Sequence, residues 1–206
     1  MFRHARSSLL AASLGALALA PVSVAAKPVI QVLNPPPPSF ETCKIVGGGA
    51  ICDGTQTVSY GPVDTGIVCG TRAGAFDIFD QGTYNQHAIR YYDQNGSLTR
   101  RVIHSNYSFG QWSNPSTGAT VNYTQHNVET DVLAIPGDLS SSTQTVTGEN
   151  IYRTGTGAPI FIATGRQVFN FDGSELLFSA GRNGFIAAFF QGDTAAFDQV
   201  CAALAT

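Results

Sequence analysis

Three histidines, His87, His104 and His126, are the side chains of this sequence best suited to chemistry. An imidazole titrates near neutral pH, so it can relay a proton or ligate a metal ion. Each of the three lies in a segment that alternates polar and apolar residues, a pattern typical of β-strands. Their chemistry depends on whether the strands bring them to one face of a sheet.

The dipeptide Asn95-Gly96 predicts the register of the first two of these strands. Asn-Gly favours a two-residue type I′ hairpin turn, which fixes the pairing on either side of it. That register pairs His87 with His104 and Tyr91 with Arg100.

The same register indicates which surface of the hairpin is buried. Arg90 and Arg101 oppose each other, and two facing arginines are expected in water. The other surface carries Ile89 and Val102 beside the histidines, so we predict that it faces the interior.

His126 is expected on the same inward surface. Val128 shares its position in the strand alternation, whereas the charged Glu129 lies on the opposite surface. A five-residue loop at 113–117 would pair His126 directly with His104 and place all three imidazoles side by side.

Three inward imidazoles allow several interpretations. They could ligate a zinc-like ion, form a polar ligand patch or an acid–base site, or be buried histidines that hydrogen-bond to neighbouring groups. We expect no metal ion and no cofactor, and we predict a ligand-binding set on this face. Its members are His87, Tyr91, Arg100, His104, Asn122 and His126.

The segments that carry these residues are short, rich in Val, Ile, Tyr, Phe and Thr, and separated by turn residues. Strands are predicted at 56–60, 75–79, 86–92, 98–109, 119–133, 143–152, 160–171, 175–180 and 185–189. One helix is predicted at 194–204, with Asp193 as its N-cap. We predict an all-β fold, a single antiparallel up-and-down β-barrel of about eight strands with one C-terminal α-helix, and a β-sandwich as the alternative. Trp112 is expected as a rim aromatic.

The N-terminus has the pattern of an export signal. Arg3 and Arg6 precede an apolar run, and small residues follow at 24–26. We predict a signal peptide at 1–26 and a secreted, extracellular protein. Residues 27–42 are predicted as a proline-rich N-terminal arm in polyproline II conformation, and 43–206 as a disulfide-stabilised barrel domain.

Four cysteines, Cys43, Cys52, Cys69 and Cys201, follow the signal. An even number in an exported chain predicts two disulfides, for which three pairings are possible. Cys43 and Cys52 lie close together around three glycines, and a bond between them would leave Cys69 to join Cys201.

The charge of the chain argues against some partners. It carries 14 acidic and 11 basic residues, and the basic residues are scattered. Nucleic acids and anionic membranes bind clustered basic surfaces, so we expect neither as a partner. We expect a monomer with a possible small-molecule ligand.

Four stretches carry a resemblance to known proteins: residues 90–97 (Arg-Tyr-Tyr-Asp-Gln-Asn-Gly-Ser), 114–118 (Asn-Pro-Ser-Thr-Gly), 164–166 (Thr-Gly-Arg) and 198–204 (Asp-Gln-Val-Cys-Ala-Ala-Leu). With them the chain resembles secreted actinobacterial proteins of unassigned function, and its layout is similar to small barrels of the lipocalin and allene-oxide-cyclase type. The resemblance implies an interior cavity for a small apolar or amphipathic molecule, and it implies no catalytic residues.

The leading hypothesis is therefore a secreted barrel that binds such a molecule in its interior. The alternatives are an isomerase or cyclase that uses one imidazole in the same cavity, and an extracellular interaction or inhibitor module. An interaction module would use the loop at 112–118 or the proline-rich arm.

Overall fold

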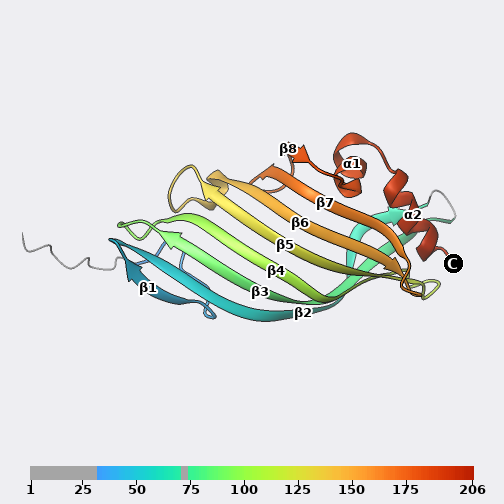
Figure 1. Ribbon diagram of the computed structural model, residues 1–206, viewed down its shortest axis with the longest axis horizontal. Helices are drawn as coiled ribbons and strands as arrows, with labels where there is room; N and C mark the ends of the chain where they lie inside the picture. The colour runs from blue at the N-terminus through green and yellow to red at the C-terminus, as the bar shows by residue number, and fades with distance from the viewer. Residues whose placement is uncertain (1–31, 71–73) are drawn as a thin grey trace, which may run out of the picture.

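The computed structural model describes residues 32–70 and 74–206, so the predicted signal peptide lies outside the described residues. The described chain is mostly antiparallel β-structure with two short helices, which confirms the all-β prediction (Figure 1). No helix within these ranges is long and apolar enough to cross a membrane.

Eight strands form one sheet in which each strand pairs with the next in the chain. They are β1 (Thr42–Val46), β2 (Gly49–Cys69), β3 (Phe76–Tyr92), β4 (Leu98–Ser113), β5 (Thr120–Leu133), β6 (Ser142–Thr154), β7 (Pro159–Asn170) and β8 (Leu176–Ala180). The predicted up-and-down order is therefore present. Within the described residues β1 and β8 do not pair with each other, so the sheet is not closed.

The strands are fewer and longer than the sequence pattern predicts. The segment 56–60 belongs to the 21-residue β2, and β3 contains the segment 86–92 and all of 75–79 except its first residue. Long strands run along the length of the molecule, and the helices lie at one end of it (Figure 1).

The predicted strand at 185–189 is wrong, because this segment is helix α1 (Gly184–Gln191). The Asn183 side chain accepts hydrogen bonds from the backbone N–H groups of Phe185 and Ile186 and so caps the helix. Gly192, with φ +74°, ends it in the left-handed conformation. An uninterrupted apolar run has no periodicity that would distinguish a short helix from a strand.

The second helix, α2 (Ala195–Leu204), confirms the predicted C-terminal helix. The predicted N-cap is wrong by one residue: Thr194 occupies the N-cap position, and its side chain makes no capping bond. Asp193 lies one residue earlier, where its Oδ1 accepts the backbone N–H of Ala195 at 3.1 Å.

The predicted β3–β4 register is correct, although its turn is not. His87 pairs with His104, and Tyr91 pairs with Arg100. The Gly96 N–H donates to the Asp93 carbonyl, so the turn is one residue wider than a two-residue hairpin loop, and Thr99 restores the register as a bulge.

The predicted inward face is wrong. Ile103 on β4 and Leu133 on β5 are buried, whereas His104 and His126, which occupy the alternate positions, are exposed. We call the buried surface the inner face and the histidine surface the outer face. Side chains alternate strictly along a strand, so the whole predicted set moves outside together.

Arg90 and Arg101 can lie on the inner face because each of them has a carboxylate partner. Arg101 forms ion pairs with Asp131 and, at 3.0 Å, with Glu129. Arg90 Nε lies 2.9 Å from Glu41 Oε1, and the Glu41 side chain is fully buried. Two facing arginines can therefore point inward without remaining unpaired.

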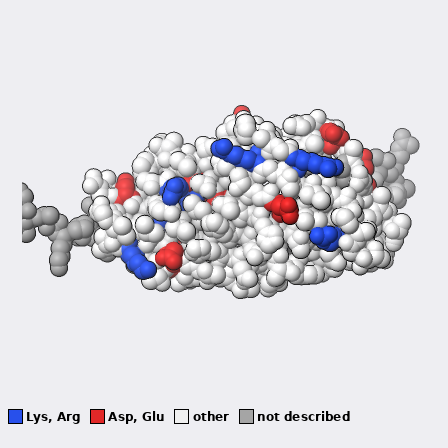
Figure 2. Space-filling model, viewed as in Figure 1, with Lys and Arg blue, Asp and Glu red and all other residues white. Residues whose placement is uncertain are grey.

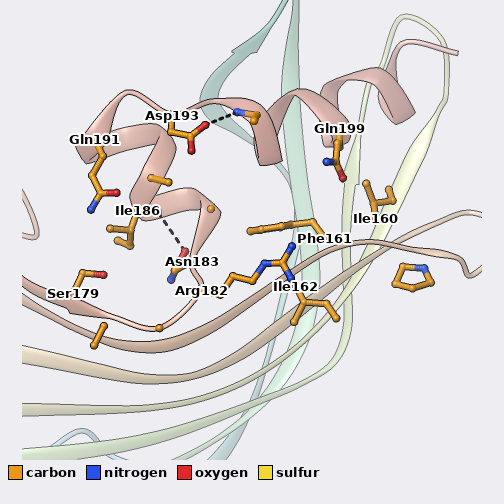
Figure 3. Close-up of a pocket in the computed structure, with 16 residues that line it drawn as sticks. Ile160, Phe161, Ile162, Ser179, Arg182, Asn183, Ile186, Gln191, Asp193 and Gln199 are labelled. Carbon is orange, nitrogen blue, oxygen red and sulfur yellow. Dashed lines mark hydrogen bonds between the residues drawn. The ribbon is translucent and has the colours of Figure 1, made fainter.

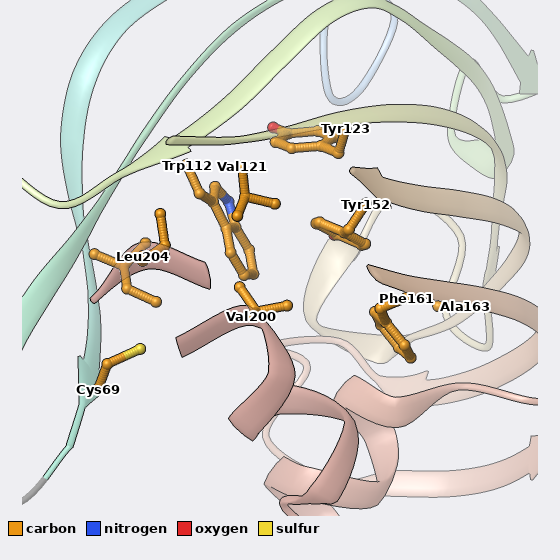
Figure 4. Close-up of a cluster of buried hydrophobic side chains, with 10 residues drawn as sticks. Cys69, Trp112, Val121, Tyr123, Tyr152, Phe161, Ala163, Val200 and Leu204 are labelled. Carbon is orange, nitrogen blue, oxygen red and sulfur yellow. The ribbon is translucent and has the colours of Figure 1, made fainter. Parts of the chain in front are cut away.

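Two apolar clusters lie on the inner face, one at each end of the sheet. The larger, at the helix end, joins sheet residues to α2: Cys69, Ile78, Trp112, Val121, Tyr123, Tyr152, Phe161, Ala163, Val200 and Leu204 (Figure 4). The smaller, at the opposite end, contains Ala50, Cys52, Tyr92, Leu98 and Leu133.

Trp112 is at the centre of the larger cluster, so its predicted place at an exposed rim is wrong. It is 8% exposed, and its ring centroid lies 5.2 Å from that of Tyr152 and 5.5 Å from that of Phe185. Aromatic rings at such distances contribute packing beyond the area that they bury.

Both disulfides have the pairing that sequence proximity favours. Cys43 and Cys52 face each other across β1 and β2, and Cys69 at the end of β2 joins Cys201 in α2. The second bond ties the helix to a strand 132 residues away in the sequence.

The described part of the proline-rich arm packs against the β3–β4 turn. The backbone of Asn34 donates to the Gly96 carbonyl at 2.8 Å and accepts from Leu98 at 2.8 Å. The Tyr92 hydroxyl donates to the Pro35 carbonyl at 2.9 Å. The arm thus covers the small cluster and belongs to the folded body.

Replacing Cys69 and Cys201 together by Ala should lower the free energy of unfolding by about 4 to 5 kcal/mol, because this bond closes a long loop in the unfolded chain. Replacing Cys43 and Cys52 should cost less, about 2 to 3 kcal/mol. Urea denaturation would measure both, and equal losses would contradict the loop-length explanation.

Replacing Asp131 by Asn should destabilise the fold by on the order of 3 kcal/mol, because Arg101 loses its most buried partner. Arg100→Ala on the outer face should cost no more than about 1 kcal/mol. Urea denaturation of the two variants would show which arginine the fold depends on, and a larger loss for Arg100→Ala would contradict the assignment of faces.

Candidate functional site

The three histidines share the outer face but do not form one cluster. The rings of His87 and His104 stack with centroids 6.0 Å apart, whereas His126 pairs with Asn106, two residue pairs further along the strands than His104. The connection after β4 is longer than the predicted five residues, and β4 carries a bulge, so the register shifts by two positions. No group of three potential metal ligands occurs in the part of the chain that the structure describes.

The other members of the predicted set also lie on the outer face. The guanidinium carbon of Arg100 lies 4.1 Å from the centroid of the Tyr91 ring, so the cation finds an aromatic partner at the surface. Asn122 accepts a hydrogen bond from Gln111 Nε2 at 2.9 Å. The six residues thus lie on the outer face of the sheet and do not line one common pocket.

The inner face between the two apolar clusters carries two adjoining hollows, of about 260 and 180 Å³, which share Asn127 and Val146. We call them together the inner groove. Polar side chains from the five neighbouring strands β3 to β7 line it: Gln86, Ser105, Gln125, Asn127, Glu129, Asn150 and Gln167.

Two amide groups in the groove have unused hydrogen-bonding capacity. Asn150 Oδ1 and Gln167 Nε2 are buried and have no hydrogen-bond partner among the described residues. Gln167 is 6% exposed. Leaving a buried donor or acceptor unpaired costs about 1 to 3 kcal/mol, so such groups usually meet a partner. One free acceptor and one free donor therefore line the same hollow.

Glycine opens the floor of the groove between these amides. Gly148 on β6 lines the smaller hollow and pairs with Gly165 on β7. A Cβ atom at Gly148 would lie 2.3 Å from the His126 carbonyl oxygen, so β5 and β6 could not approach as they do with any larger residue. The pair leaves space where side chains would otherwise fill the hollow.

An aromatic pair forms the groove wall on the β3–β4 side. The rings of Tyr84 and Tyr107 stack with centroids 4.7 Å apart and an angle of 20° between their planes. Both border the larger hollow. The groove thus combines flat apolar surfaces with amide groups.

A carboxyl group held by two phenols lies where the groove meets the large cluster. Tyr60 donates to Asp80 Oδ2 at 2.9 Å, and Tyr123 donates to Asp80 Oδ1 at 3.0 Å. Burial raises the pKa of Asp80, against the hydrogen bonds from both hydroxyls. Burial also raises the pKa of both tyrosines, so they remain protonated donors at neutral pH.

Gly110 allows Tyr123 to take this position. The two residues face each other on β4 and β5, and a Cβ atom at Gly110 would lie 2.3 Å from the Tyr123 ring. The ring therefore lies flat over the glycine, and its hydroxyl reaches Asp80.

At the other end of the groove, Glu129 borders the larger hollow and pairs with Arg101. Burial raises the pKa of Glu129, and the neighbouring Asp131 adds to the increase. The inner face therefore has two carboxyl groups that hold their protons more tightly than exposed ones.

Sequence reasoning missed the groove because it placed Gln125, Asn127 and Glu129 of β5 on the outside and assigned Asn150 and Gln167 to neither face. Gln125, Asn127 and Asn150 recur at alternate positions of β5 and β6, and this polar periodicity is visible in the sequence. That of β5 was assigned to the solvent side because polar faces of sheets are usually wet.

Comparison of the chain with protein-family models, with curated proteins and with solved structures finds no match in any of the three. The candidate site therefore rests on the geometry of this chain.

The raised pKa of Asp80 predicts a pH-dependent stability. The folded state keeps the Asp80 proton to higher pH than the unfolded state, so the carboxyl's contribution to stability falls as pH rises through and above the ordinary aspartate range. Asp80→Asn removes this titration. Its free energy of unfolding relative to wild type should therefore increase between about pH 3 and pH 7.

Urea denaturation at several pH values would measure this difference. Asp172→Asn is a control of opposite sign, because the hydrogen bond from the Ser174 hydroxyl lowers the pKa of Asp172. Its relative stability should decrease over the same range. A pH-independent difference for Asp80→Asn would contradict the assignment.

Proposed function

We propose that the protein is a secreted binding protein whose inner groove holds a small amphipathic molecule. The observation that carries this proposal is the unpaired donor of Gln167 and the unpaired acceptor of Asn150 in one hollow. A ligand with both an acceptor and a donor would satisfy both groups.

The lining favours an amphipathic ligand over a purely apolar one. A hydrocarbon would leave Asn150 Oδ1 and Gln167 Nε2 without partners, at a cost for each. The stacked rings of Tyr84 and Tyr107 offer an apolar surface beside them. Binding sites of this kind combine apolar walls with a few polar groups that orient the ligand.

Secretion is part of the proposal. Two disulfides fit an oxidising compartment, and the export pattern at 1–26 supplies the route. On the face shown in Figure 2, Lys and Arg side chains are scattered among Asp and Glu.

The second candidate is an isomerase or cyclase that acts in the same groove. The observation that favours it is the position of Glu129 and Asp80, two carboxyls with raised pKa, toward opposite ends of the inner face. General acid–base catalysis needs groups that hold a proton near the working pH. In this candidate mechanism a carboxyl group, and not an imidazole, transfers the proton, because the histidines lie on the outer face of the sheet.

The ligand should be visible in native mass spectra of the protein purified from culture medium. We expect an organic adduct on the wild type, no adduct on Gln167→Leu, and the adduct retained on His104→Ala. The leucine has nearly the same shape and no unpaired donor, so Gln167→Leu should change the free energy of unfolding by no more than about 1 kcal/mol.

Two other outcomes of the mass spectra would contradict binding in the inner groove. A bare wild-type protein would contradict a ligand that is carried constitutively. Loss of the adduct in His104→Ala, with retention in Gln167→Leu, would move the site to the outer face.

A further inference from the structure

The edge of β7 presents backbone hydrogen-bonding groups beyond the end of β8. The N–H of Thr164 donates to the Arg182 carbonyl at 2.6 Å, so Thr164 directs its backbone away from β6. Residues two apart in a strand direct their N–H and C=O groups to the same side. Ile162 therefore points its N–H and C=O groups to the side that β8 would have occupied, whereas the register shift at Arg153 makes Ile160 a bulge and interrupts the alternation there.

The chain leaves this edge because a helix begins there. Asn183 follows Arg182 directly and caps α1, so the backbone turns away from β7. Within the described residues, β8 pairs with β7 only from Phe169 to Arg166, and no strand covers Ile160 and Ile162. An uncovered strand edge is a template for another strand.

A cleft of about 670 Å³ lies along this edge. The residues Pro159–Ile162 form one side, the segment Ser179–Gly184 the base, and the helices the other side (Figure 3). Four extended residues span about 13 Å, so the edge has room for a strand of about that length. Phe161 and Ile186 supply apolar walls.

The cleft also has a cation without an acidic partner. In Figure 3 the Arg182 side chain extends toward Phe161 and Ile162. No carboxylate of the described residues lies within ion-pair distance of Arg182. Asp193, the acidic residue of the lining, accepts the Ala195 N–H instead.

We propose that this cleft binds an extended peptide segment of a partner protein by strand addition to β7, with an acidic side chain of the peptide paired to Arg182. The N–H and C=O of Ile162 bind the peptide main chain, and the apolar walls take its alternate side chains. This site is separate from the inner groove and does not depend on the proposed ligand.

The test uses the mature protein and the blocked peptide acetyl-Ile-Glu-Ile-Thr-amide, followed by ¹⁵N NMR titration at millimolar concentration. We expect chemical-shift changes confined to the cleft and slower hydrogen exchange of the Ile162 amide. The same peptide with alternate backbone nitrogens methylated should bind at least tenfold more weakly, and so should the peptide with Gln in place of Glu.

Three protein variants complete the test. Ile162→Pro removes the N–H that points into the cleft but leaves the bonds to β6, and Arg182→Gln removes the cation while the edge stays intact. Each should weaken binding at least tenfold, and the matched control Ile162→Val should stay within twofold of wild type. Circular dichroism would show that the variants fold.

Equal binding of the methylated peptide, no effect of Arg182→Gln, or no shift at the cleft would overturn the proposal. Concentration-dependent dimerisation that protects the same Ile162 amide would also overturn it, because the occupant would then be a second copy of this chain.

Discussion

The ion pair between Arg101 and Asp131 is the interaction on which the arrangement of the sheet depends. It lets Arg101 of β4 point toward the inner face. Because side chains alternate strictly along a strand, this orientation then decides which residues of β4 and its neighbours lie on the inner face and which on the outer face. His104 follows to the outside, and Gln125 and Asn127 follow to the inside. The position of one guanidinium group thus distinguishes an amide-lined interior from a histidine-lined one.

The open sheet is closed at one end by covalent and apolar contacts. The Cys69–Cys201 bond holds α2 against the end of β2, and Val200 and Leu204 insert into the aromatic cluster around Trp112. The helix α2 thus packs against β5 and β7 and is bonded to the end of β2. The same arrangement leaves a short part of the β7 edge uncovered, because α1 begins before β8 reaches it.

Local patterns predicted the strand order, the pairing of His87 with His104, the C-terminal helix and the disulfides. The register was right because two irregularities, the wider turn at Gly96 and the bulge at Thr99, cancel each other. The inner face could not be predicted, because it depends on Glu41 and Asp131, which meet their arginines only in the folded sheet. The free amides of Asn150 and Gln167 likewise become visible only when burial is known.

Trp112 is the only tryptophan of the chain, and it lies in the cluster that joins the sheet to the helices. Its indole therefore serves as an intrinsic optical reporter of that end of the molecule. Its emission should follow the undocking of α1 and α2. Events at the arm end, whose small cluster contains Tyr92 and no tryptophan, would be silent in this signal. The protein thus carries a spectroscopic means of observing its two ends separately.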